Sequence, residues 1–318
     1  MTDISAAMPR SKIPVWRTAY DGYRLGIAAI FSSGAMFRFF VYGSVLSIAV
    51  LGAEVYLMFW IVVSLSERAS DILALLIPFV AYIAITAVQT PLGIVLQRRI
   101  LLGDFPSRSY VAYAVDHRGR NYAFVLLLIC GFYFLASLIE IPMNLLFFGQ
   151  PFVPAEIPVE DITYATYAML MLLAWVVTFA IASVMSAKCA FMFPAVACER
   201  PGSWRQAYGE TRGIVWPLFA VFLIAFLPVL LLFAIVSVGA FIASLSPFME
   251  TLSIGDGVSD LATEQAMHSM LLSPVFIVAY IFAGLAYMLS FVVTAAAAAR
   301  AYQIRVERGL SGVAEIFS

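Results

Sequence analysis

Apolar residues dominate this chain in long uninterrupted blocks, not in the short periodic patterns of a soluble domain. Six blocks stand out: 39–65, 72–97, 121–140, 163–187, 214–243 and 271–299. A helix needs roughly 20 consecutive apolar residues to cross the hydrocarbon core of a bilayer. The pattern therefore predicts an all-α, polytopic membrane protein with six transmembrane helices.

The composition agrees with a membrane location. The 318 residues are 63% hydrophobic and 12% charged, with a mean hydropathy of +0.98, whereas a soluble domain carries roughly 25% charged residues. The first 38 residues lack a short apolar core next to a small-residue cleavage site, so we expect no cleaved signal peptide. The chain is expected to divide into a cytoplasmic N-terminus (1–38), a transmembrane domain (39–303) and a short cytoplasmic tail (304–318).

Basic residues mark one side of the membrane. The chain has 18 Lys and Arg residues, and all but Arg68 fall in four regions. These regions are the segment before the first block, the connection between blocks two and three, the connection between blocks four and five, and the segment after the sixth block. The connections 140–161 and 250–264 each hold four acidic residues and no Lys or Arg. Lys and Arg are enriched in cytoplasmic loops. We therefore expect both termini in the cytoplasm, with the protein in a bacterial inner membrane.

Two stretches predict amphipathic helices on the cytoplasmic side. The segment 14–38, PVWRTAYDGYRLGIAAIFSSGAMFR, mixes aromatic rings with charged side chains. That mixture is typical of a helix in the membrane interface, with its rings toward lipid and its charges toward water. In SWRQAYGETRG, Ser203 suits the N-cap, Gln206 completes the capping-box spacing, and Gly213 suits the C-terminus. A short surface helix is therefore expected before the fifth block.

The connections before blocks three and five are similar to each other. GDFPSRSYVAYAVDHRGRNY aligns with CERPGSWRQAYGETRGIVW, and a weaker third copy begins at Pro14. Internal similarity of this period predicts duplicated units of one surface helix and two spans, and the matched residues form recurring hinge motifs. The matched positions are Asp104 with Glu199, Pro106 with Pro201, and, after a one-residue slip, Arg118–Gly119 with Arg212–Gly213.

The stretch AKCAFMFPAVACE followed by GSWRQAYGETRGIVWPLF resembles a broad superfamily of bacterial six-helix membrane proteins. That superfamily includes the membrane domain attached to some glycerophosphoryl diester phosphodiesterases. The similar features are Lys188 ahead of Pro194, the acidic Glu199, and the pattern S-W-x-x-A-x-x-x-T-R-G from Ser203. The stretch QRRILLGDFP looks like the family's earlier cytoplasmic connection. The resemblance covers most of 80–305 and implies the fold; it implies no activity, because the phosphodiesterase chemistry belongs to a separate soluble barrel.

Glu54 is the main candidate for intramembrane chemistry. It lies near the middle of the first block, where a carboxyl group costs several kcal/mol unless it is neutral, paired or hydrated. Two interpretations stay open: a proton relay or binding group in a cavity, or a carboxyl group hydrogen-bonded to Tyr82 or Thr86. Gln89 and Thr90 are polar residues that interrupt the second apolar block just before Pro91. A proline inside a membrane helix either interrupts the helix beside a cavity or is tolerated as a kink. The candidate polar site is therefore Glu54, Thr86 and Gln89.

Small residues recur in two of the blocks. Gly43, Ser44, Ser47 and Gly52 lie in the first block, and five consecutive alanines occupy 295–299 in the sixth. Small side chains let membrane helices approach each other closely. These positions are expected to carry helix contacts, within the bundle or between chains.

The sequence lacks the common catalytic and cofactor motifs. The patterns G-x-S-x-G, G-x-x-x-x-G-K-[ST] and H-E-x-x-H do not occur. Cys189 and Cys198 lack the paired short spacing of zinc sites and have no adjacent histidine. We expect a protein that is not an enzyme, with no cofactor, no metal and no nucleic-acid partner.

Two hypotheses of function follow. The first is a non-catalytic membrane protein that organises or accompanies other components, with membrane lipids and other membrane proteins as partners, because the distinctive residues lie in surface hinges. The second is a transporter or lipid-handling protein with a cavity near Glu54, which the repeats and the prolines favour. Loss of solute or lipid movement on Glu54→Gln would distinguish the second from the first.

Overall fold

The computed structural model describes residues 13–64, 67–139, 142, 162–198, 209–253 and 273–307, and within these ranges the protein is all-helical, as predicted. Most of the predicted surface helix at 203–213 and of the connection 140–161 lies outside the described residues. The elements are α1 (Val15–Ile30), α2 (Gly34–Ser64), α3 (Glu67–Leu102), α4 (Tyr110–Val115), α5 (His117–Ser137), α7 (Ile162–Cys189), α8 (Met192–Ala197), α10 (Val215–Ser253), α12 (Pro274–Tyr302) and the π-helical turn η2 (Gln303–Glu307).

Within the described residues, five helices are long and apolar enough to cross a membrane. They match five of the six predicted blocks in the same order. The remaining block, 214–243, is the fifth in order and falls in α10, where the apolar helix Val215–Val229 is shorter than these five. The chain therefore has the helices of a multi-pass membrane protein. The five spans are Gly34–Met58, Leu76–Leu102, His117–Ala136, Thr166–Ala197 and Pro274–Arg305.

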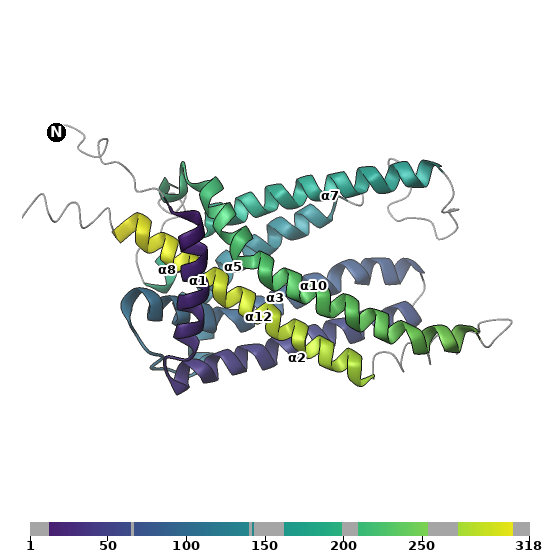
Figure 1. Ribbon diagram of the computed structural model, residues 1–318, viewed down its shortest axis with the longest axis horizontal. Coiled ribbons are helices and arrows are strands. Elements are labelled where there is room, and N and C mark those ends of the chain that lie inside the picture. The colour runs from purple at the N-terminus through teal and green to yellow at the C-terminus, as the bar shows by residue number, and fades with distance from the viewer. Residues whose placement is uncertain are drawn as a thin grey trace, which may run out of the picture.

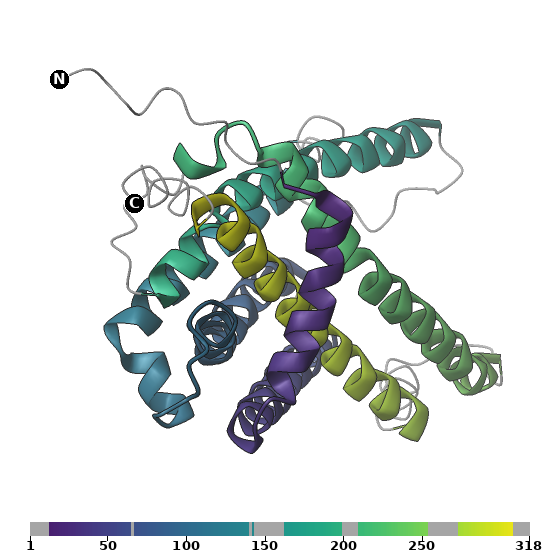
Figure 2. The same ribbon diagram turned by 60° about the vertical axis from the view of Figure 1, so that its left-hand side comes forward.

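The first helix lies across one end of the bundle of long helices (Figure 1). The helices α4 and α8 and the last turns of α12 lie at this same end, which we call the α1 end; the opposite end is the far end. α12 is central in the packing, because it contacts α1, α2, α3, α8 and α10. α7 and α10 lie close together at the α1 end and separate toward the far end in both views (Figures 1 and 2).

The buried core fills the α1 end. Met288 and Val292 of α12, Leu92 and Leu96 of α3, and Leu218 of α10 are fully enclosed there. Toward the far end, many described side chains are large, apolar and exposed. A bilayer surrounds such side chains with hydrocarbon, so their exposure costs little free energy. Examples are Leu76 and Val80 of α3, Met169 and Leu172 of α7, Leu231 and Ile235 of α10, and Val275 and Val278 of α12.

Small residues explain why α1 and α12 pack so closely. A Cβ atom added to Gly22 would lie 2.8 Å from the Ala297 Cβ and 3.0 Å from the Val293 carbonyl oxygen. One turn later, a Cβ atom on Gly26 would lie 3.1 Å from a methyl group of Val292. The predicted role of the alanines at 295–299 in close helix contact is therefore confirmed, and their partner is α1 of the same chain.

Among the described elements, a short helix followed by two long helices recurs as α1, α2, α3, as α4, α5, α7 and as α8, α10, α12. The matched hinge positions nevertheless differ locally. Gly213 has φ +81° and follows a helical turn at 209–211, which confirms it as a helix end. Gly119, by contrast, lies inside α5, where a Cβ atom would clash with the Tyr113 carbonyl oxygen of α4. The internal repeat therefore stays a prediction.

Candidate functional site

Polar side chains from three helices gather around Glu54. This residue is half-buried on α2, and its carboxyl group lies within electrostatic reach of the hydroxyls of Tyr82 on α3 and of Tyr280 and Tyr287 on α12. The side chain of Gln89 on α3 lies close to the Tyr287 hydroxyl. We call these five side chains the Glu54 cluster. One carboxyl group, one amide and three phenols thus lie near one another in the membrane-spanning part of the bundle.

The other predicted site residues have partners of their own. Thr86 is buried, and its hydroxyl lies 3.4 Å from the sulfur of Cys130 on α5. The Gln89 amide nitrogen also approaches the Met288 sulfur at 3.8 Å, and the Ser47 hydroxyl donates to that same sulfur at 3.1 Å. The predicted trio is therefore only partly one site: Gln89 belongs to the Glu54 cluster, whereas Thr86 joins α3 to α5.

The polar break in block two does not interrupt the helix. α3 runs from Glu67 to Leu102 with Pro91 inside it. Pro91 has no N–H, so the Ala87 carbonyl four residues earlier lacks its helical donor; the two neighbouring carbonyls receive side-chain donors. The Thr90 hydroxyl donates to the carbonyl four residues earlier at 2.8 Å, and the Tyr110 hydroxyl donates to the Val88 carbonyl. The continuity of α3 through this position favours the interpretation of Pro91 as a tolerated residue over that of a broken helix beside a cavity.

The sequence analysis missed the two tyrosines of α12. Tyr280 and Tyr287 are seven residues apart, so both fall on one face of the helix. Gly284 lies between them on that face, where a Cβ atom would clash with Ile48 of α2. A glycine flanked by polar residues at heptad spacing is a signal of a polar helix contact. This signal is weak, because tyrosine is common throughout the chain.

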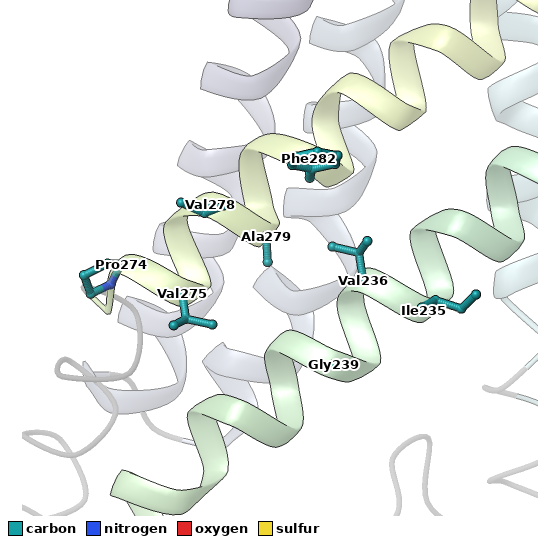
Figure 3. Close-up of a pocket in the computed structure, with 8 residues that line it drawn as sticks. All are labelled: Ile235, Val236, Gly239, Pro274, Val275, Val278, Ala279 and Phe282. Atoms are coloured by element: carbon teal, nitrogen blue, oxygen red, sulfur yellow. The ribbon is translucent and has the colours of Figure 1, made fainter.

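An apolar groove lies on the other face of α12, between α12 and α10 at the far end (Figure 3). Its volume is about 550 Å³. No lining side chain carries a polar group, so the groove has no side chain that could form a hydrogen bond or an ion pair with a ligand. Hydrocarbon chains fit such a surface. The lining residues are Ile235, Val236, Gly239, Pro274, Val275, Val278, Ala279 and Phe282.

Ion pairs tie the hinge motifs to the α1 end. Asp104 accepts a hydrogen bond from Arg98 at 2.5 Å, and Arg98 also donates to the Ala197 carbonyl of α8 at 3.1 Å. Pro106 lies in the same connection between α3 and α4. Arg212 is exposed just before Gly213, while the matched Glu199, Pro201 and Ser203 lie outside the described residues. Arg98 and its partner Asp104 thus link the end of α3 to α8.

Asp116 is the N-cap of α5 and the centre of a small charged group. Its carboxylate accepts from the His117 backbone N–H at 2.6 Å and lies 2.7 Å from the His117 Nδ1, 3.4 Å from Arg108 and 3.9 Å from Arg118. Partial burial raises its pKa, but the hydrogen bonds to His117 and the nearby charges outweigh this effect. The net result is a pKa below the ordinary aspartate value, so the ionised form is stabilised.

α1 combines an aromatic outer face with a fixed inner face. Trp16 and Tyr20 are 75% and 67% exposed, and Arg17 and Arg24 are exposed beside them. The one acidic residue of α1, Asp21, accepts from the Arg300 Nε at 3.0 Å, so its charge is paired on the inner side.

A second contact holds α1 against α10. The Tyr23 hydroxyl donates to the Ala225 carbonyl at 2.6 Å. Burial raises the pKa of Tyr23, so its hydroxyl stays protonated and keeps this donor. Together with the glycine contacts to α12, this bond makes α1 a fixed part of the bundle.

Metal-binding chemistry is limited in the part of the chain that the structure describes. Within those ranges no three His, Cys, Asp or Glu side chains gather in one place. Cys130, Cys189 and Cys198 are free thiols. Comparisons of the chain with protein families, curated proteins and solved structures found no match. The resemblance of the sequence to the six-helix superfamily therefore stays a prediction.

Proposed function

We propose that this chain is a non-catalytic integral protein of a bacterial inner membrane that organises or accompanies other membrane components. Its contacts are with lipids and with neighbouring membrane proteins. The single observation that carries the proposal is the outer face of α1, where Trp16, Arg17, Tyr20 and Arg24 are exposed while Asp21 is paired inward. Aromatic rings and arginines on one helix face suit the head-group region of an anionic membrane.

In this proposal the bundle has six spans, with α10 as the fifth in order. α10 is a continuous helix of 39 residues, which is long enough for a span at 1.5 Å per residue. The α1 end faces the cytoplasm, because the basic connections gather there. Amphipathic helices at this end and duplicated units of one short and two long helices complete the architecture.

Topology is tested by labelling engineered cysteines from outside intact cells in a background without native cysteines. The variant Ile157→Cys is expected to react with a membrane-impermeant maleimide, and Gln206→Cys is expected to react only after the membrane is opened. The reverse labelling pattern would mean that the protein has the opposite orientation in the membrane. The argument for lipid contact at α1 would then fail.

The lipid contact is tested on the full chain extracted from native membranes in a mild detergent. The ratio of bound phosphatidylglycerol to phosphatidylethanolamine is measured by mass spectrometry. Each basic side chain at an anionic surface contributes about 1 kcal/mol. The double variant Arg17→Gln, Arg24→Gln should therefore lower the ratio roughly thirtyfold, since about 1.4 kcal/mol corresponds to a factor of ten.

A matched control comes from the same end of the bundle. Arg108 is an exposed arginine, but it lies 3.4 Å from Asp116, so Arg108→Gln should change the lipid ratio much less than the α1 double variant. Equal ratios for the wild type and the α1 double variant would contradict a lipid-binding role for α1.

The Glu54 cluster favours a second candidate function, transport or lipid handling. A carboxyl group, an amide and three phenols lie near one another at membrane depth between α2, α3 and α12. The test is movement of a solute or a fluorescent lipid across liposomes that contain the purified chain. Movement that Glu54→Gln abolishes would replace the accessory role with this second function; no movement by the wild type argues against it.

A further inference from the structure

No Lys or Arg lies close to Glu54, Tyr82 or Tyr280 along the sequences of the three helices that form the cluster. No Lys or Arg occurs between Arg38 and Arg68, between Arg68 and Arg98, or between Arg212 and Arg300. The residues of α2, α3 and α12 that form the cluster all lie within these gaps. A carboxylate inside a membrane is costly unless it is neutral or paired. The ionised form of Glu54 therefore needs a positive charge from another molecule.

The cluster also holds a hydrogen-bonding group that is not satisfied within the described residues. The Tyr280 hydroxyl oxygen is buried, but it has no hydrogen-bond partner there. Buried polar atoms in proteins nearly always have a partner, so an exception requires an explanation. The Tyr280 ring packs beside Gly52 of α2, where a Cβ atom would lie 3.8 Å from the ring. Tyr280 thus stands at the contact between α2 and α12, one helical turn or less from the level of Glu54.

The cluster is reachable from the surface of the bundle. Glu54 is only half-buried, and the Tyr82 side chain is 52% exposed. Tyr287 and Gln89 lie deeper, and Gln89 is buried. The polar groups therefore extend from the outer surface of α3 into the bundle. This arrangement differs from a sealed structural hydrogen bond.

We propose that the Glu54 cluster is a binding site for an organic ammonium group, carried by an amphiphile or by a free organic cation. The Glu54 carboxylate supplies the counter-charge, and phenol oxygens accept hydrogen bonds from an N–H donor or surround a quaternary nitrogen. A charge-assisted hydrogen bond is stronger than a neutral one, and aromatic rings attract quaternary ammonium groups in desolvated sites. This site is independent of the lipid contact at α1.

The test uses the full chain in nanodiscs, with lipid-only nanodiscs subtracted to remove partitioning of the probe. Octyltrimethylammonium, tetramethylammonium and the neutral octyl glucoside are titrated, and binding is measured by microscale thermophoresis. The wild type is expected to bind octyltrimethylammonium at least tenfold more tightly than octyl glucoside. Glu54→Gln is expected to lose this preference, and Tyr280→Phe to weaken it. Binding of tetramethylammonium as well would identify a free organic cation as sufficient, whereas binding of the octyl compound alone would identify an amphiphile.

The controls separate a binding role from a folding role. Tyr56→Phe removes a phenol from the same helix as Glu54, but Tyr56 is exposed at 57% and lies outside the cluster; its affinity should equal that of the wild type. Thermal unfolding of each variant checks that the bundle is intact. Equal affinity of the wild type and Glu54→Gln, or no ammonium binding by the wild type, would overturn the proposal. Neither result affects the lipid ratio measured with the α1 variants.

Discussion

The α1 end and the far end of the same bundle are held together differently. At the α1 end, side chains such as Leu218 and Val292 are fully enclosed, and ion pairs join helices that are distant in sequence. At the far end, the described side chains of α7, α10 and α12 are large and exposed, and α7 and α10 diverge (Figure 2). One bundle thus contains a packed half and an open half.

The difference shows which forces pack helices in a membrane. Burial of apolar surface drives packing weakly there, because lipid tails are as apolar as leucine. Close approach of small residues and hydrogen bonds between helices remain as the main attractions. Both are concentrated at the α1 end, where Gly22 meets Ala297 and Asp21 meets Arg300. The stability of the bundle should therefore depend mainly on that end.

The largest expected difference concerns two leucines of α10. Leu218 is fully enclosed at the α1 end, whereas Leu231 is 53% exposed toward the far end. Leu218→Ala should leave a cavity and cost about 2–5 kcal/mol, while Leu231→Ala should cost about 0.5 kcal/mol or less. Unfolding in mixed micelles with increasing dodecyl sulfate measures both. Similar losses for the two variants would abolish the distinction between the ends.

A second pair of substitutions adds atoms in place of removing them. Gly22→Val would place side-chain carbons against Ala297 and the Val293 carbonyl, and overpacking of this kind costs about 1–3 kcal/mol. A Cβ atom on Gly239 of α10 would meet nothing within 4 Å. Gly239→Val should therefore leave the unfolding midpoint within error of the wild type. A stable, monodisperse Gly22→Val protein would show that α1 does not pack closely against α12.

The ion pair between Asp21 and Arg300 should contribute less than the packing of Leu218. The two side chains are 17% and 25% exposed, and the Nε–Oδ2 distance is 3.0 Å. Removal of a hydrogen bond to a charged group costs about 1.5 kcal/mol, so Asp21→Asn should lower the unfolding free energy by about that amount. A double-mutant cycle with Arg300→Gln isolates the pair. A coupling energy of zero would mean that α1 is held by its glycine contacts alone.

The smallest expected effect is a pH dependence that arises at Asp116. Its folded-state pKa is lowered, so the carboxylate stabilises the fold above the ordinary aspartate pKa of about 3.9 and this contribution is lost as the pH falls through the lowered value. Asp116→Ser keeps an N-cap oxygen but removes the titrating group. The variant should lose less stability than the wild type between about pH 5 and pH 3. Parallel pH profiles would show that Asp116 does not contribute to acid unfolding.

Sequence reasoning predicted the spans far better than the contacts between them. Hydropathy alone located the five described helices that are long and apolar enough to span a membrane, because each helix in a bilayer must satisfy its own backbone. Capping chemistry identified Gly213 as a helix end, and the run of small side chains identified 295–299 as a close-contact surface. Local chemistry was sufficient in these cases, since a left-handed glycine or a run of alanines has few alternative roles.

The candidate site was predicted only in part. Glu54 stood out in the sequence because a carboxyl group is rare at membrane depth, and Gln89 because it interrupts an apolar block. Tyr280 and Tyr287 did not stand out, since a tyrosine at a helix surface is ordinary. Their importance depends on where α12 crosses α2 and α3, which no local pattern specifies.

The sequence by itself determined that the chain is helical, that its long helices suit a bilayer, and where its charges lie along the chain. These properties follow from each segment's own contact with lipid or water. Only the tertiary structure decided that α1 is clamped across α12, that Thr86 pairs with Cys130 and not with the Glu54 cluster, and that one half of the bundle packs while the other opens. Helix partners in a membrane are chosen by shape and a few hydrogen bonds, and those become defined only when distant segments meet.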